Sequence, residues 1–342
     1  MHPFDEIKSD RLLERLESFV LEAAGAARAR ISPLQRMSGG AVQQNWAVDA
    51  ELTGGPLAGN QRWVLRMDAP ASVAESLTRN EEFRVLKAMQ EADVLAPRPL
   101  WSCEDGRVMG RPFFIMQRLP GIAAGHKLAR DASLVPDRSR LARELALNLA
   151  RIHSVEPQHP ALGFLKTALA RDNVAHYRSY LDTLDESHPV LEWGLRWCET
   201  HAPEREDVTF IHRDYRTGNY LVDNGKLIGT LDWEFAGYGN PLEDVGWLFA
   251  KCWRFGQHRY PVGGVADAED FLREYEAASG RHVDAAALVY WQVMAHLRWA
   301  VIALQQRERH RSGIEPSLEL ALTGHLISDL ELEILELTTK KS

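Results

Sequence analysis

The chain has 342 residues, of which 45% are hydrophobic and 26% are charged, and its formal net charge is −8. A chain of this length exceeds a single small hydrophobic core, so we expect two domains or lobes. The negative charge is not offset by a basic stripe, which argues against a nucleic-acid partner.

The composition also predicts where the protein resides. The first twenty residues are charged and amphipathic and lack the apolar core of a signal peptide, and no apolar run is long enough to predict a membrane span. Cys103, Cys198 and Cys252 are widely spaced and lack a metal-type pairing, which is typical of reduced thiols. We therefore expect a cytoplasmic protein without membrane association, and the sequence implies no obligate protein partner.

The first third of the chain contains both helical and strand-like patterns. A turn rich in glycine, proline and asparagine separates two of the strands, and a Pro-Gly pair ends the last one. The expected elements are a helix over 4–24, strands over 41–50 and 61–68, a helix over 72–91 and a buried strand within 111–121.

Helical patterns dominate after about residue 120, apart from one β-rich segment. In that segment, strand-like runs at 208–212 and 226–233 flank residues 219–222, and Asn224-Gly225 predicts a tight hairpin turn. The helices are expected over 136–153, 191–201, 267–279 and 284–309.

Polar residues in the β-rich segment form a candidate metal and phosphate site. Asp214 lies two residues after His212, Asn219 lies five residues after Asp214, and Asp232 lies thirteen residues after Asn219. Oxygen ligands of this kind suit Mg²⁺ bound to a triphosphate, and a carboxylate that does not bind the metal can orient an incoming hydroxyl group. Asp and Asn residues that cap turns give similar local patterns, so that interpretation stays open for each residue taken singly.

The segments IHRDYRTGN (211–219) and LIGTLDWE (227–234) resemble the catalytic loop and metal-binding segment of the aminoglycoside phosphotransferase/choline kinase family, relatives of protein kinases. The resemblance covers most of the chain and is most specific over 209–247. It implies an α+β, bilobal protein-kinase-like fold with a small β-rich N-lobe and a larger, mainly helical C-lobe. The expected lobes are 1–117, which binds nucleotide and carries an extra N-terminal helix, and 118–342, which is catalytic and binds the acceptor.

The resemblance also implies roles for single residues. Asp214 is expected to accept or orient the proton of the substrate hydroxyl group, with His212 beside it in the catalytic set. Asn219 and Asp232 are expected to bind Mg²⁺. Asp244, in GNPLEDVGWL, is expected to brace the catalytic loop.

A kinase-like fold needs a cation on its third strand and a helix carboxylate that holds this cation. Arg66 stands where the family template has lysine, and its guanidinium can pair with the α- and β-phosphates of ATP. The alternative is an arginine on the exposed side of a strand. Glu82 is the best candidate for the helix carboxylate, with Glu81 as the second.

Two further segments complete the predicted nucleotide site. The run FFIMQRLPG resembles the hinge between the lobes, where the carbonyl of Gln117 and the amide of Leu119 would read the adenine edge and Met116 would line the pocket. The turn RMSGGAVQQNW lies between two strand-like runs, and its small residues let backbone amides approach phosphate oxygens, as ordinary hairpins also do. These residues are Ser38, Gly39 and Gly40.

The sequence predicts the phosphoryl donor better than the acceptor. Kinases of cationic antibiotics need an acidic acceptor pocket, whereas this chain ends in the basic LELTTKKS. The motifs look closest to the branch related to the kinase-like domain fused to some acyl-CoA dehydrogenases. In the apolar helix expected over 284–309, a buried Arg298 would need either an internal partner or an acid group of the acceptor.

We therefore predict an ATP- and Mg²⁺-dependent small-molecule O-kinase that transfers the γ-phosphoryl group to a hydroxyl group. One alternative is a nucleotide-binding pseudokinase, which Arg66 in place of lysine keeps open. Another is a metal-dependent phosphohydrolase built on His212, Asp214 and Asp232, although it leaves the hinge and the glycine turn unexplained. A protein kinase is disfavoured because no long activation segment separates Asp232 from GNPLEDVGW.

Overall fold

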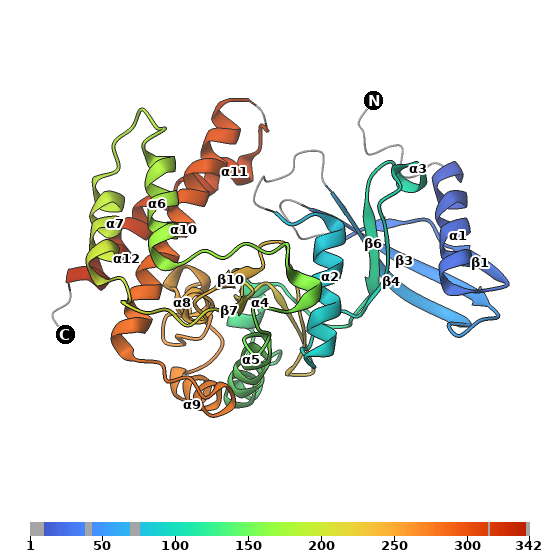
Figure 1. Cartoon of the computed structure of the whole chain (residues 1–342), viewed down its shortest axis with the longest axis horizontal. Coiled ribbons are helices and arrows are strands. Elements are labelled where there is room, and N and C mark those ends of the chain that lie inside the picture. The colour runs from blue at the N-terminus through green and yellow to red at the C-terminus, as the bar shows by residue number, and fades with distance from the viewer. Residues whose placement is uncertain (1–9, 38–42, 69–75, 314, 340–342) are drawn as a thin grey trace. The chain divides into compact units, whose positions relative to one another are not determined.

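A computed structural model describes residues 10–37, 43–68, 76–313 and 315–339. The chain forms two compact units (Figure 1). The first unit is rich in strands and the second is mainly helical, which confirms the predicted α+β class. The first unit comprises Met1–Pro120, Pro160–Phe164 and Ile228–Phe235, and the second comprises Gly121–His159, Leu165–Leu227 and Ala236–Ser342.

The first unit is built on an antiparallel sheet in the order β1-β3-β4-β6-β5, with β2 also paired to β3. The glycine- and proline-containing turn expected between the two long strands joins β3 to β4. The strands are β1 (Arg28–Ile31), β2 (Gln35–Arg36), β3 (Gln43–Thr53), β4 (Gly59–Asp68), β5 (Pro99–Cys103) and β6 (Phe113–Gln117), and a short helix, α3 (Gly106–Met109), lies between the last two.

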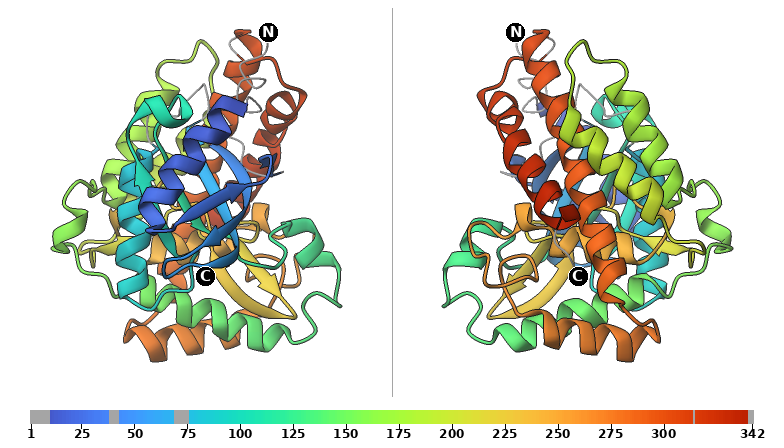
Figure 2. Two further views of the ribbon diagram at one scale, coloured as in Figure 1. Left: turned by 90° about the vertical axis from the view of Figure 1, so that its right-hand side faces the viewer. Right: turned by 90° about the vertical axis from the view of Figure 1, so that its left-hand side faces the viewer.

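The two faces of this sheet carry different side chains because successive residues of a strand point to opposite faces. Trp63 and Leu65 of β4 form an apolar core with α1 (Asp10–Ala24), which lies across the sheet (Figure 2). Arg66 alternates with them and therefore lies on the opposite face. Helix α2 (Arg79–Glu91), which contacts β4, β5 and β6, places its own charged residues against that face.

The helix expected over 72–91 begins at Arg79 in the structure, and residues 69–75 lie outside the described part of the chain. Thr78 precedes the helix and accepts a hydrogen bond from the backbone N–H of Glu81, whose carboxylate accepts one from the N–H of Thr78 at 2.8 Å. This reciprocal cap fixes the first turn of α2. It also occupies Glu81, so that Glu82 is the carboxylate that faces the sheet.

The second unit packs around a long helix, α10 (Ala285–Arg311), which contacts five neighbouring helices (Figure 2). Within the described residues, α10 is the one helix long and apolar enough to cross a membrane, but 61% of its most apolar window is buried, and a core helix passes the same test. The other helices are α4 (Gly125–Arg130), α5 (Arg138–Ile152), α6 (Ala170–Leu181), α7 (Pro189–His201), α8 (Leu242–Phe249), α9 (Ala268–Ser279), α11 (Leu318–Gly324) and α12 (Ile327–Thr339).

The β-rich segment folds as two short antiparallel pairs. β7 (Thr209–Ile211) pairs with β10 (Gly237–Gly239), and β8 (Tyr220–Asp223) pairs with β9 (Lys226–Thr230). Asn224 and Gly225 both have positive φ, as the predicted two-residue turn requires. The strand expected over 226–233 ends at Thr230, because Asp232 has a left-handed backbone with φ 67° that cannot continue a strand.

Candidate active site

Asp214 lies in the loop between β7 and β8, and both of its carboxylate oxygens accept hydrogen bonds. Oδ1 accepts from the indole Nε1 of Trp247 at 2.8 Å and from Nε of Arg216 at 3.0 Å. Oδ2 accepts from the side-chain amide nitrogen of Asn219. Three donors on one carboxylate fix its orientation.

Asn219 is oriented by the same loop. Its amide nitrogen also donates to the main-chain carbonyl of Asp214 at 3.0 Å, which leaves the amide oxygen as the atom that can bind a cation. Gly218, just before it, has φ 114°, a backbone that residues with a side chain rarely adopt. This positive φ favours glycine in the loop, and a Cβ here would also displace the guanidinium of Arg216, whose Nη1 would lie 2.7 Å away.

Asp244 of α8 holds the backbone of the loop, as the resemblance predicted for this residue. Its carboxylate is fully buried and accepts hydrogen bonds from the N–H groups of His212 and Arg213, both at 2.7 Å. His153 contacts the same carboxylate at 3.1 Å. Burial alone would raise the pKa of Asp244, but the hydrogen bonds and charge interactions from His153 and His212 hold it below its usual value.

His212 is fully buried and contacts the backbone of the loop. Its Nδ1 accepts a hydrogen bond from the backbone N–H of Asp214 at 3.1 Å. The ring therefore helps to fix the backbone of Asp214. Membership of His212 in the catalytic set stays a prediction.

Arg66 is only 4% exposed, so the alternative of an exposed strand arginine is wrong. Its Nε lies 2.9 and 3.0 Å from the two carboxylate oxygens of Glu82, and one terminal nitrogen donates to Asp232 at 2.6 Å. Burial alone would lower the pKa of Arg66, but Glu82, Asp232 and Glu234 together raise it, so the guanidinium stays charged. The structure thus forms the predicted pair of Arg66 with Glu82. Phosphate binding by Arg66 stays a prediction.

Arg79 is a second buried guanidinium of the first unit, and sequence reasoning missed it. Its side chain is 1% exposed and donates to Glu82, to Asp68 at 2.9 Å and to the carbonyl of Leu77 at 2.7 Å. Glu82 is therefore held from two sides. The signal in the sequence was the spacing of Arg79 and Glu82, three residues apart on a helix, where oppositely charged side chains meet.

Asp232 and Asn219 are the predicted Mg²⁺ ligands, and their donor atoms fit that ion. The side chain of Asp232 is 24% exposed and the amide oxygen of Asn219 is oriented for a cation, and both atoms are hard oxygen donors. In the described residues, no group of three or more His, Cys, Asp or Glu side chains could hold a metal. Phosphate oxygens and water commonly complete the coordination of Mg²⁺ in proteins.

The predicted hinge lies at the end of β6. Met116 is buried and Gln117 is exposed, and the backbone N–H of Gln117 donates to the carbonyl of Arg98 at 2.9 Å. Adenine recognition by the carbonyl of Gln117 and the amide of Leu119 stays a prediction. The predicted glycine turn, Ser38, Gly39 and Gly40, lies outside the described residues.

Arg298 of α10 has an internal partner, which answers one question that the sequence left open. Its guanidinium donates to the carbonyl of Arg213 in the catalytic loop, and it lies 3.9 Å from Glu243. It also lies 4.7 Å above the ring of Trp247. These contacts link α10 to the loop and to α8. Sequence reasoning did not identify Trp247, because a tryptophan in an apolar run gives no functional signal.

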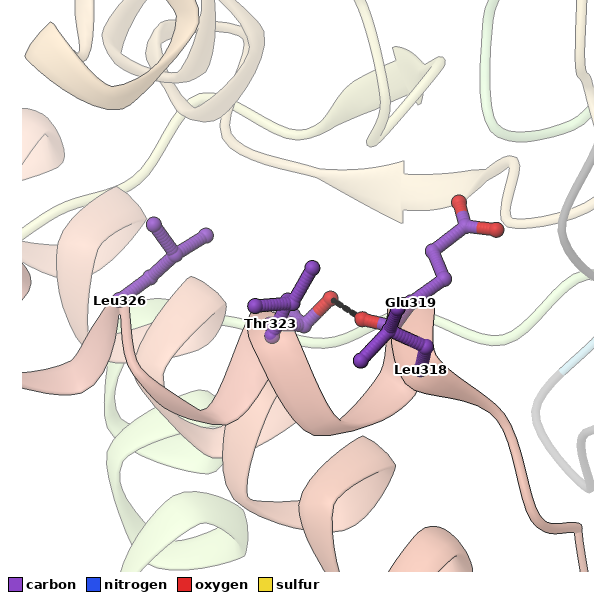
Figure 3. Close-up of a pocket in the computed structure, with 5 residues that line it drawn as sticks. Leu318, Glu319, Thr323 and Leu326 are labelled. Atoms are coloured by element: carbon purple, nitrogen blue, oxygen red, sulfur yellow. Dashed lines mark hydrogen bonds between the residues drawn. The ribbon is translucent and has the colours of Figure 1, made fainter.

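A pocket of about 430 Å³ lies at α11, and none of the predicted site residues lines it (Figure 3). Its lining is mostly apolar, and Leu318 and Leu322 are 75% and 57% exposed. Thr323 donates a hydrogen bond to the carbonyl of Glu319, within the helix (Figure 3). The lining residues are Leu318, Glu319, Leu322, Thr323 and Leu326.

Sequence comparison finds a relative that is much longer than this chain. The chain is 33% identical over 171 residues to acyl-CoA dehydrogenase family member 10 of Mus musculus, a match that covers 48% of this chain. It spans only 16% of the length of that relative.

Two solved structures share the fold over nearly the whole chain. One is a Ralstonia eutropha protein with a provisional assignment as an aminoglycoside phosphotransferase, at 21% identity and a TM-score of 0.76, covering 96% of this chain and 98% of that one. The other is an aminoglycoside phosphotransferase in complex with AMP-PNP and hygromycin B, at 16% identity and a TM-score of 0.61, covering 94% of this chain and 97% of that one. These likenesses confirm the predicted protein-kinase-like fold. A model of the phosphotransferase enzyme family matches residues 33–288, and the chain belongs to this family.

Proposed function

We propose that the protein is an ATP- and Mg²⁺-dependent kinase that transfers the γ-phosphoryl group of ATP to a hydroxyl group of a small molecule. The observation that carries the proposal is the environment of Asp214. A carboxylate that only caps a turn needs one donor, whereas this one accepts hydrogen bonds from Trp247, Arg216 and Asn219. Asp244 holds the loop backbone just before it, through the N–H groups of His212 and Arg213.

The acceptor step follows from the hydrogen bonds of Asp214. Each carboxylate oxygen has lone pairs for about two hydrogen bonds. Oδ1 already accepts two, so Oδ2 keeps the capacity to accept the proton of an acceptor hydroxyl group. In phosphoryl transfer this positioning contributes much of the catalysis, because the protein itself does little covalent chemistry.

The donor step uses the buried charges of the first unit. In this proposal Arg66, held by Glu82, contacts the phosphates, and Asp232 contributes an oxygen to Mg²⁺. When bound, Mg²⁺ neutralises charge on the phosphate oxygens. The relative solved with AMP-PNP supports a nucleotide as the donor.

The proposed acceptor is a small hydroxylated molecule, and the proposed location is the cytoplasm. The solved relative with hygromycin B supports a small-molecule acceptor. Cys103, Cys198 and Cys252 are all free thiols, which supports a reducing compartment. Fractionation of cells that produce the full-length protein would test the location.

The experiment is an acceptor screen followed by ³¹P NMR, with ATP and GTP compared in the presence and absence of Mg²⁺. Hydroxyacyl thioesters come first, because a relative is an acyl-CoA dehydrogenase family member. Amino alcohols and aminoglycosides follow. We expect a new phosphate monoester that forms only with nucleotide and Mg²⁺.

Two other outcomes would overturn the proposal. Tight Mg²⁺-dependent ATP binding without transfer to any acceptor or to water would identify a pseudokinase. Release of phosphate from monoesters in the absence of nucleotide would identify a phosphohydrolase.

A further inference from the structure

Two side chains of helix α8 that lie three residues apart form hydrogen bonds with the loop between β7 and β8. Asp244 accepts hydrogen bonds from the loop backbone, and Trp247 donates one to the side chain of Asp214. Residues three apart on a helix share a face, so α8 presents both groups to the loop together. Asp244 fixes the backbone of the loop, and Trp247 fixes the carboxylate of Asp214.

We propose that Trp247 is a positioning residue for phosphoryl transfer: its indole N–H fixes Oδ1 of Asp214, so that Oδ2 is the oxygen presented to the acceptor hydroxyl group. This inference rests on the proposed kinase function. In the transfer, the acceptor O–H bond breaks and its proton passes to Oδ2, while the acceptor oxygen bonds to the γ-phosphorus. The bond from that phosphorus to the bridging oxygen breaks, and ADP leaves with the electron pair.

The indole of Trp247 is itself held in place, which a positioning residue requires. It is 3% exposed. The guanidinium of Arg298 lies 4.7 Å from its ring centre, and the ring of Trp253 lies 5.1 Å away at an interplanar angle of 53°. Rotation of the indole would break these contacts, so the direction of its N–H is fixed by packing.

Arg216 also donates a hydrogen bond to Oδ1 of Asp214, but it holds this oxygen less permanently than Trp247 does. Its side chain is 24% exposed and its guanidinium lies 4.3 Å from the ring centre of Trp253. A partly exposed arginine can exchange Asp214 for water or for a phosphate oxygen. The indole N–H of Trp247 is buried and cannot exchange Asp214 for water. It is therefore the donor that stays bound to Asp214 through the reaction.

A buried tryptophan of the first unit offers a matched control. Trp46 is 3% exposed, as Trp247 is, and its Nε1 has no hydrogen-bond partner among the described residues. Trp247→Phe and Trp46→Phe remove the same atoms from two buried indoles. Only the first deletes a hydrogen bond to Asp214.

Activity is measured for both variants with the acceptor found by the screen, and with water as the acceptor. We expect Trp247→Phe to lower kcat by about ten- to a hundredfold, the range for losing a hydrogen bond to a charged group, with KM for ATP unchanged. Trp46→Phe should show no comparable loss. Equal losses in the two variants, or a loss that appears in KM for ATP, would show that Trp247 only fills space.

Indole N–H resonances give a second readout that does not depend on turnover. Each resonance is assigned by its disappearance in the matching Trp→Phe variant. We expect Asp214→Ala to shift the Trp247 resonance strongly and to leave that of Trp46 nearly unchanged. An unmoved Trp247 resonance would overturn the inference even in an active enzyme. Absence of any phosphoryl transfer, with the Trp247 resonance shifted, would instead overturn the proposed kinase function and leave the contact intact.

Discussion

Arg66, Glu82 and Asp232 form a charged network in the first unit, and Arg79 completes it. Buried charges are costly to separate from water unless each is paired. Glu82 is shared by two guanidinium groups, so removal of one of them does not leave its carboxylate uncompensated. Since Arg79 still pairs with Glu82, we expect a protein without the Arg66 side chain to fold.

We expect Arg66→Ala to weaken ATP binding by roughly ten- to a hundredfold while adenosine binding changes little, because adenosine lacks the phosphates that Arg66 contacts in the proposed site. Competition binding of ATP and adenosine to both proteins measures this difference. Arg62→Ala is a control on the same strand, since that side chain is 75% exposed. Equal weakening of both ligands would mean that Arg66 only supports the fold of the first unit.

His296 of α10 makes the stability of the protein depend on pH. It is 1% exposed and contacts the carbonyl of Gln292 through Nδ1 at 2.6 Å. Burial lowers the pKa of His296 to about 4, and the nearby charges of Arg254 and Lys251 also lower it. Between about pH 6.5 and 4 the unfolded chain therefore binds a proton that the folded chain does not, so stability falls as pH falls.

The predicted contribution of His296 is about 3 kcal/mol, fully present above about pH 6.5 and lost by about pH 4. Urea unfolding from pH 7.5 down to pH 4.5 measures it. His296→Gln should flatten the fall in the urea midpoint over this range. The control His126→Gln, at an exposed position, should leave the curve unchanged. A parallel fall in wild type and His296→Gln would show that other groups cause it.

Helix α8 holds the loop between β7 and β8, and a glycine of α8 determines how closely this helix packs against α10. A Cβ at Gly246 would lie 2.5 Å from Cβ of Trp291 and 2.6 Å from its backbone carbon, closer than real contacts allow. Glycine therefore lets α8 approach α10. This approach places Asp244 and Trp247 at the loop.

We expect Gly246→Ala to lower the free energy of unfolding by about 1–3 kcal/mol, the usual cost of overpacking, and also to lower kcat, because α8 must shift. Urea unfolding and the phosphoryl-transfer assay measure the two effects. Gly163→Ala is the control, since a Cβ there meets nothing within 4 Å. An unchanged kcat in a destabilised Gly246→Ala protein would contradict the dependence of the loop on the position of α8.

Elements with a clear periodic pattern were predicted well from the sequence, and short buried ones were not. The helices expected over 136–153, 191–201, 267–279 and 284–309 match α5, α7, α9 and α10 within about two residues. Helix α8 was not predicted, because its eight residues are nearly all buried and show no polar face. Helices α6, α11 and α12 were also missed.

At the scale of the whole molecule, the sequence does not show how the chain is divided. The predicted division into lobes over 1–117 and 118–342 stays a prediction. The first compact unit of the structure comprises Met1–Pro120 together with Pro160–Phe164 and Ile228–Phe235. These segments join the first unit through tertiary contacts, such as the hydrogen bond from Arg84 to the carbonyl of Ala161 at 2.6 Å. Contacts between distant segments leave no local periodic pattern.

The candidate site also contains residues that the sequence alone does not reveal, because they act through contacts between distant segments. Asp214, Asn219 and Asp232 were identified because they belong to a motif with fixed spacing. Trp247 was missed because its role comes from a contact with Asp214 across 33 residues of sequence. The motif thus points to the groups that are proposed to react, and the structure shows which side chains hold Asp214 in place.

The most direct test of the central claim compares Asp214→Ala with Asp232→Ala. If Asp214 takes the proton of the acceptor, Asp214→Ala should lose orders of magnitude in the rate of phosphoryl transfer while its Kd for Mg²⁺-ATP stays close to that of the wild type. Asp232→Ala should weaken Mg²⁺-ATP binding itself. Titration calorimetry with Mg²⁺-ATP, on samples whose transfer rate is also measured, gives both quantities. Equal losses of binding and rate in Asp214→Ala, or an unchanged rate, would contradict the proposed role of Asp214.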